Sequence, residues 1–120
     1  DWYTEKRIPA SIPKSGIEYE YLYVNGELDI DCIILKKKRE HIGIYKIQDV
    51  VSLAPLDQKR LRGYRRDRNT KIRDCSGGRK NLRYGMMISQ NDQRELIIFE
   101  PNQEMLTDMQ RRSPEKVRFV

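Results

Sequence analysis

The chain has 120 residues, the size of a single domain that buries roughly two-thirds of its unfolded surface. Hydrophobic residues make up 38% and charged residues 35%, which predicts a modest core, and seven tyrosines with many Ile, Leu and Val argue against a disordered chain. The net charge of +6 permits an anionic partner without requiring one. Cys32 and Cys75 are too few for a disulfide framework, so we expect a reducing compartment.

Residues 1–16 are expected to form an extended lead-in, because "IPASIPKSG" is punctuated by proline and glycine. Trp2 and Tyr3 stand next to basic residues, an order also found where a membrane helix leaves the lipid. An ordinary frayed terminus is the alternative. The chain begins with Asp1 rather than methionine, so we expect the natural protein to continue upstream into a membrane anchor.

A β-hairpin is predicted over "EYEYLYVNGELDIDCII", residues 18–34, because apolar and polar side chains alternate on both sides of a tight turn. The turn is Asn25-Gly26, whose residues both tolerate a positive φ. One strand places three tyrosines on the same side, and we expect them to pack inward rather than stack on bases: Tyr19, Tyr21 and Tyr23. The return strand has an apolar face with Leu28, Ile30, Cys32 and Ile34.

The middle of the chain predicts three further short strands. A charged turn over 36–40 leads to "HIGIYKI", with Ile42 and Ile44 expected to point inward, and then to "VVSLAP". Residues 57–69 are mostly charged and lack a wide apolar face, so we expect an exposed loop or one short helical turn. "TKIRD" is the fifth predicted strand.

The last part of the chain predicts a second hairpin and one helix. "RYGMMISQ" and "RELIIFE" flank Asn91-Asp92, and Pro101 suits the first position of a helix that Pro114 stops. Seven short antiparallel strands followed by one amphipathic helix indicate a mainly β fold, a partly open barrel or sandwich capped by that helix.

This order of elements resembles the pleckstrin-homology-like (PH-like) fold, and in particular its bacterial families, which are often attached to membrane helices. "YEYLYVNGELDID" resembles their opening hairpin, "IGIYKIQDVVSLAP" the following segment, and "LIIFEPNQEMLTDMQRRSP" the final strand and helix. The resemblance implies one PH-like domain over 17–120 and a binding or scaffolding role on the cytoplasmic side of a membrane, without fixing a ligand. Eukaryotic phosphoinositide-binding members use basic residues in the first hairpin loop. In this sequence that loop is taken as Asn25-Gly26, which argues against inositol-phosphate binding of that kind.

Two basic runs are the candidate contacts for an anionic surface. The first is Lys36, Lys37, Lys38 and Arg39, which either hold the domain against lipid headgroups or only keep a turn solvated. The second run, residues 59–73, contains eight cations and one acid, Asp67. Its candidate contacts are Arg60, Arg62, Arg65, Arg66 and Arg68. Tyr64 lies among them and is a candidate for stacking, and a mobile charged loop is the alternative.

No group of residues predicts catalysis, a cofactor or a metal site. Cys75 has basic neighbours but no base in its segment, because His41 is the only histidine. "SGGRK" lacks the spacing of a phosphate loop, and one histidine with two distant cysteines makes no tetrahedral site. We therefore expect a non-enzymatic module that contacts an anionic membrane surface or an acidic protein, with no small-molecule substrate. Nucleic-acid binding through 59–73 is the alternative, and a homo-oligomer stays open.

Overall fold

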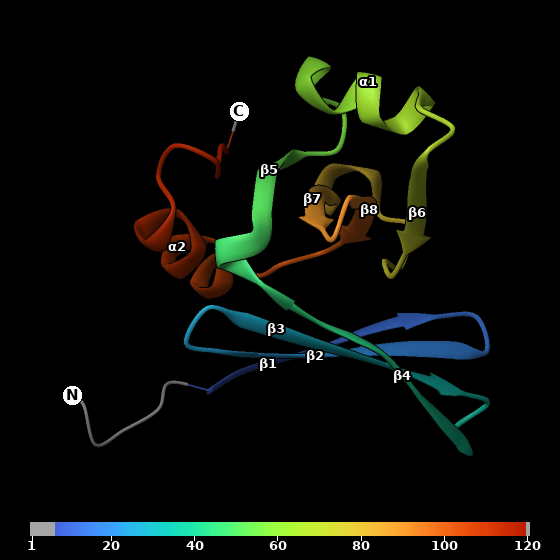
Figure 1. Ribbon diagram of the computed structural model, residues 1–120. Coiled ribbons are helices and arrows are strands. Elements are labelled where there is room, and N and C mark those ends of the chain that lie inside the picture. The colour runs from blue at the N-terminus through green and yellow to red at the C-terminus, as the bar shows by residue number, and fades with distance from the viewer. Residues whose placement is uncertain (1–6, 120) are drawn as a thin grey trace.

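The computed structural model describes residues 7–119, which form two four-stranded sheets and two α-helices (Figure 1). Sheet A is an antiparallel meander of β1 (Arg7–Lys14), β2 (Ile17–Val24), β3 (Glu27–Ile34) and β4 (Lys38–Lys46). Sheet B has the order β5-β7-β8-β6 and consists of β5 (Val50–Pro55), β6 (Thr70–Asp74), β7 (Tyr84–Gln90) and β8 (Gln93–Phe99). Short 3₁₀ turns, η1 (Ile47–Asp49) and η2 (Lys80–Leu82), precede β5 and β7.

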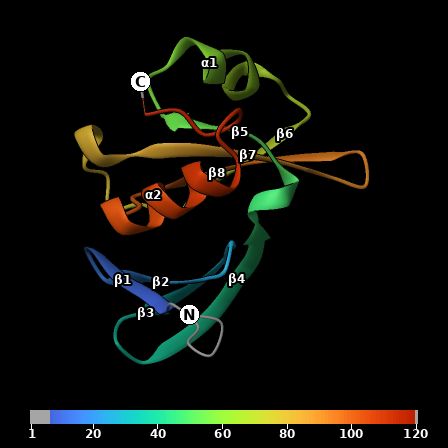
Figure 2. The same ribbon diagram turned by 90° about the vertical axis from the view of Figure 1, so that its left-hand side faces the viewer.

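The main core lies between the two sheets and is closed by α2 (Gln103–Arg112), as Figure 2 shows. Sheet A contributes Tyr21, Tyr23, Leu28 and Ile30; sheet B contributes Leu53, Met86, Ile97 and Phe99; and α2 contributes Met105, Leu106 and Met109. The predicted mainly β fold with a capping C-terminal helix is thus confirmed. The tyrosines of β2 pack inward, as expected. Among residues 7–119, neither helix is long and apolar enough to cross a membrane.

Both predicted hairpins are confirmed, and their turns have the expected backbone. Asn25 and Gly26 have φ values of 49° and 83°, and Asn91 and Asp92 have values of 50° and 64°. Two consecutive left-handed residues match the right-handed twist of the flanking strands, which is why asparagine, aspartate and glycine are favoured there. The last helix begins at Gln103, two residues later than predicted, because Asn102 caps it by accepting a hydrogen bond from the Met105 amide at 2.9 Å.

Residues 7–14 of the expected lead-in form an additional strand, β1, which pairs with β2 along its whole length. Ile8 and Ile12 point into the core, whereas Pro9 and Pro13 lie on the outer face of sheet A. The prolines are tolerated because β1 is an edge strand, where a missing amide hydrogen costs no ladder bond. The fold therefore has eight strands rather than seven among the described residues. Trp2 and Tyr3, with their juxtamembrane interpretation, lie outside the described residues.

The predicted orientation of β4 is wrong for one side chain. The pairing of β3 with β4 shifts register after Ile30, which lies opposite Gly43, so Ile42 is a bulged residue without a partner. A bulge inserts one residue and moves the inward and outward alternation by one place. Ile42 still packs partly against the core, but Tyr45 is buried and Ile44 is 53% exposed.

Residues 57–69 contain a two-turn helix, α1 (Lys59–Arg66), where an exposed loop or a single turn was predicted. Leu61 and Tyr64 lie one turn apart and pack on the outer face of sheet B, against a second cluster of apolar residues: Ala54, Leu56, Met87, Leu96 and Ile98. A narrow stripe is enough because β7 and β8 are apolar on both faces, as their unbroken runs "MMI" and "LIIF" indicate. The helix carries the chain from one edge of sheet B to the other, so β6 pairs with β8 in parallel rather than antiparallel.

Candidate functional site

The first basic run lies at one end of sheet A, on the turn between β3 and β4. The Leu35 amide donates a hydrogen bond of 2.8 Å to the Gly16 carbonyl, which holds this turn against the β1–β2 turn and its neighbour Lys14. We call the combined surface the hairpin tip: Lys14, Leu35, Lys36, Lys37 and Lys38. All five side chains are exposed, and Leu35 most notably, because 68% of its surface faces solvent.

The charges of the hairpin tip are largely uncompensated. Among residues 7–119, Lys14, Lys36 and Lys37 form no ion pair, and Lys38 pairs only with exposed Glu40 at 3.1 Å. Arg39 does not belong to the tip, because it binds carboxylates on the outer face of sheet A. The tip is therefore a strongly cationic surface with one exposed aliphatic side chain.

The hairpin tip also borders an apolar groove of about 530 Å³. Pro13, Ile17 and Ile33 form its apolar wall, and Lys14 and Lys36 also line it. Leu35 and Lys36 both adopt left-handed backbone, with φ values of 51° and 59°. Branched or bulky side chains rarely adopt this conformation, so leucine is not the residue that the turn itself favours.

The second basic run is exposed on α1. Lys59, Arg60, Arg62, Arg65 and Arg66 are all exposed, and within the described part of the chain none of them forms an ion pair. We call these five side chains the α1 face. Arg68 follows the helix and is also exposed, but it lies beyond the helix end. Tyr64 packs against the outer face of sheet B and is half-buried, so only part of its ring is exposed.

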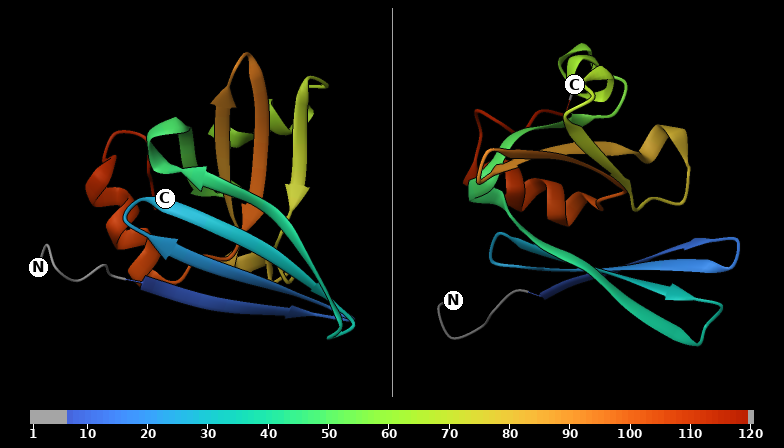
Figure 3. Two further views of the ribbon diagram at one scale, coloured as in Figure 1. Left: turned by 60° about the horizontal axis from the view of Figure 1, so that its bottom comes forward. Right: turned by 45° about the vertical axis from the view of Figure 1, so that its right-hand side comes forward.

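The two basic runs lie on opposite sides of the molecule: α1 lies on the outer side of sheet B, and the β3–β4 turn of the hairpin tip lies at one end of sheet A (Figures 1 and 3). A single flat surface cannot contact both sets of predicted residues at once. The structure instead joins Lys36, Lys37 and Lys38 to Lys14 and Leu35, which the sequence did not single out. Lys14 could be associated with them only by recognising β1 as a strand.

Comparison with known protein families gives a match over residues 9–119, to the family described as Bacterial PH-like domain (DUF6106). The chain belongs to this family. The resemblance of the sequence to bacterial PH-like domains is thereby confirmed over nearly its whole length. Comparison with curated proteins and with solved structures found no match.

In this PH-like domain the first hairpin turn is Ser15-Gly16, not Asn25-Gly26, because β1 precedes the predicted first strand. The absence of cations from Asn25-Gly26 would argue against inositol-phosphate binding only if this were the first hairpin turn. Asn25-Gly26 belongs to the second hairpin, so its composition excludes nothing at the first. Its actual turn follows Lys14 directly and lies beside the lysines of the next hairpin.

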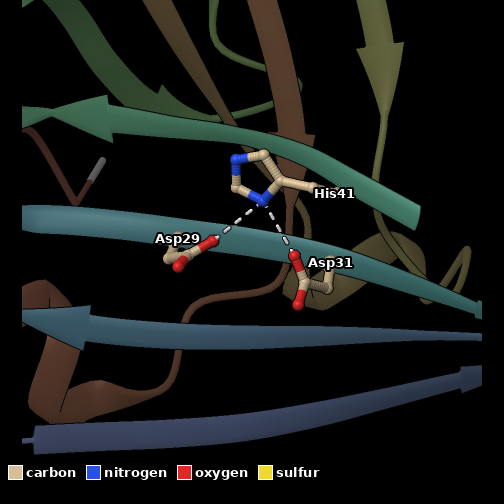
Figure 4. Close-up of side chains that lie close together, drawn as sticks. All are labelled: Asp29, Asp31 and His41. Carbon is tan, nitrogen blue, oxygen red and sulfur yellow. Dashed lines mark hydrogen bonds and ion pairs between the residues drawn. The ribbon is translucent and has the colours of Figure 1, made fainter. Parts of the chain in front are cut away.

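The outer face of sheet A holds a second polar group that the sequence did not reveal (Figure 4). His41 Nδ1 lies 2.9 Å from Asp31 Oδ1 and 3.4 Å from Asp29 Oδ1. Arg39 binds the other oxygen of Asp31 at 2.9 Å and Glu20 at 2.7 Å. The hydrogen bond from His41, reinforced by Arg39, holds the pKa of Asp31 below its usual value despite slight burial. The sequence signal for this group was the D-x-D spacing of Asp29 and Asp31 on one strand face. Their partner His41 could not be predicted, because its position beside them depends on the bulge in the pairing of β3 with β4.

Asp29, Asp31 and His41 could ligate a divalent cation only through an unprotonated Nδ1, which would replace the hydrogen bond between His41 and Asp31. Arg39 already supplies positive charge to the same carboxylate, which lowers the affinity of the group for a cation. We therefore assign the three side chains to the charge network of an open sheet face.

The Cys75 segment of the PH-like domain has a structural role. Burial raises the pKa of the Cys75 thiol to about 12, so the thiol stays protonated near neutral pH. Tyr21 Oη donates to the Cys75 carbonyl at 2.5 Å. The buried Glu100 carboxylate accepts hydrogen bonds from the Gly77 amide and, at 2.7 Å, from Arg79 Nε. In a phosphate-binding loop, a backbone amide such as that of Gly77 would bind the phosphate. Here the Gly77 amide binds the internal Glu100 carboxylate instead.

Proposed function

We propose that this bacterial PH-like domain is a non-enzymatic binding or scaffolding module that contacts an anionic membrane surface through the hairpin tip. The observation that supports it is an exposed leucine surrounded by four lysines at one end of the fold. The membrane helices often attached to bacterial PH-like domains support a position at the cytoplasmic face. An anchor elsewhere in the natural protein would bring the tip close to lipid headgroups.

The chemistry of the hairpin tip fits a lipid surface better than a soluble anion. Each lysine near an anionic membrane contributes about 1 kcal/mol, so the four lysines give roughly 4 kcal/mol at low salt. Insertion of Leu35 adds about 1–2 kcal/mol, because complete burial of a leucine gives about 1.5–3 kcal/mol and the side chain is already partly covered. One aliphatic residue with a basic patch gives reversible attachment, which suits a module that is held at the membrane by another segment.

Co-sedimentation with vesicles tests this function. The 120-residue chain should sediment with phosphatidylglycerol vesicles at low salt and be released at high salt, but should not sediment with phosphatidylcholine vesicles. Leu35→Asn should weaken the binding, because asparagine suits the left-handed turn but removes the apolar group. Lys36→Glu with Lys37→Glu should abolish it.

The matched control is Arg65→Glu with Arg66→Glu, which changes the net charge equally on the α1 face. This variant should keep most of the vesicle binding. Equal losses in the two double variants would show that net charge alone drives sedimentation, and the hairpin tip would not be the contact.

Nucleic-acid binding through the α1 face is the second candidate. Its unpaired arginines favour it, because phosphate accepts the same forked hydrogen bonds as carboxylate. A mobility shift with random oligonucleotides that is lost in Arg65→Glu with Arg66→Glu would support it.

A further inference from the structure

Gly63 stands in the middle of α1 for no reason that the fold supplies. Its backbone is not left-handed, and a β-carbon placed there would have no neighbour within 4 Å. Glycine lowers the stability of a helix interior relative to alanine, so both the backbone and the surroundings would favour alanine. A residue that costs stability at an exposed position points to a requirement outside the isolated fold.

The position of Gly63 on the helix identifies that requirement. At 100° per residue, Lys59, Arg60 and Arg66 lie nearest to Gly63 around α1, and Leu61 lies on the opposite side. Gly63 therefore leaves bare helix backbone within the α1 face, between Arg60 on one side and Lys59 and Arg66 on the other. Glycine is the residue that allows another chain to approach a backbone closely.

We propose that the α1 face is a docking site for an acidic segment of a partner protein, which approaches the helix backbone at Gly63. The guanidinium groups present paired N–H donors that match carboxylates, and no internal acid occupies them among the described residues. This site is independent of the hairpin tip and lies on the opposite side of the molecule (Figure 3). A domain that rests on a membrane by its tip would present α1 to the cytoplasm.

The surroundings of α1 favour a protein over the other polyanions. Leu61 is 0% exposed and Tyr64 is half-buried on sheet B, so the helix offers no fully exposed apolar side chain for insertion into lipid. Its one aromatic residue, Tyr64, is half-buried against sheet B, so only part of a ring is exposed for a base to stack on. What remains is an arginine-rich helix face with uncovered backbone at Gly63, which suits an extended acidic peptide.

Fluorescence anisotropy with a labelled peptide of alternating glutamate and alanine tests the site on the 120-residue chain at low salt. Arg62→Glu should raise the Kd at least about tenfold, because it removes a charge-assisted contact and adds a repulsive one. The matched control, Lys37→Glu, changes the net charge equally at the hairpin tip and should change the Kd less than threefold.

Gly63→Ala separates docking from a merely structural role. It should raise Tm by a few degrees, since alanine is the better helix former, and yet raise the Kd at least about fivefold. Stability and binding must therefore move in opposite directions.

Four results would overturn the proposal. The first two are a lack of saturable peptide binding by the unmodified chain, and unchanged binding in Gly63→Ala despite a higher Tm. Equal weakening by Arg62→Glu and Lys37→Glu would also overturn it, as would Arg62-dependent binding of an oligonucleotide or of phosphatidylglycerol vesicles that is tighter than binding of the peptide. Failure of the membrane function would instead appear as unchanged vesicle binding in the tip variants.

Discussion

Asp108 connects the C-terminal helix to sheet A, and removing its charge perturbs that connection without changing the size of the side chain. Asp108 Oδ2 accepts hydrogen bonds from Tyr23 Oη at 2.6 Å and from Arg112 Nε at 2.7 Å. Its Oδ1 accepts another from Arg111 at 2.6 Å. The Asp108 side chain is 19% exposed. We predict that Asp108→Asn destabilises the fold at neutral pH.

The size of the effect follows from the pKa. Partial burial alone would raise the pKa of Asp108, but the hydrogen bonds from Tyr23, Arg112 and Arg111 outweigh it and lower the pKa from 3.8 to about 2. That lowering corresponds to at most about 2.4 kcal/mol of stability. Arg111 is largely exposed and water screens its contribution, so we expect Asp108→Asn to cost about 1.5 kcal/mol.

Urea unfolding of both proteins between pH 7 and pH 2 measures this cost. The carboxylate stabilises the fold fully above its unfolded pKa near 3.9 and loses the contribution as the pH falls toward 2. The difference in the free energy of unfolding should therefore shrink from about 1.5 kcal/mol at pH 7 to near zero at pH 2. Glu115→Gln, at an exposed site, serves as the control and should have no effect. A loss that is equally large at pH 7 and pH 2 would refute the electrostatic link.

Two further predictions concern the segment around Cys75. Glu100→Gln should lower the free energy of unfolding by about 2 kcal/mol, because the Gly77 amide and Arg79 lose a buried carboxylate, whereas a loss no larger than that of Glu115→Gln would contradict this role. Cys75 should react with an aromatic disulfide reagent at pH 8 only after unfolding, since burial raises its pKa to about 12, and rapid labelling of the native protein would show that the thiol is accessible.

The elements that could be predicted are those with a local signal. β2 and β3 alternate with a period of two around Asn25-Gly26, and α2 is bounded by proline and carries a clear apolar stripe. β1 was not predicted because Pro9 and Pro13 are typical of turns and irregular segments, although an edge strand tolerates them. The orientation of β4 depends on a bulge that only the pairing with β3 creates.

The helix α1 and the candidate surfaces required tertiary information. Two apolar residues among many cations do not look like a buried stripe, unless both faces of sheet B are known to be apolar. The sequence shows two cationic runs, but it could not show that they lie on opposite sides of the molecule. The association of Lys14 with Leu35 depends on a hydrogen bond between two turns that are distant in sequence.

The central claim is that Leu35 enters an anionic membrane while α1 stays in water. Because Cys32 and Cys75 are buried, Leu35→Cys and Arg62→Cys can each be labelled in the native protein with a polarity-sensitive fluorophore. Addition of phosphatidylglycerol vesicles should shift the emission at position 35 to the blue and leave position 62 unchanged. No shift at position 35, or a larger shift at position 62, would contradict the account.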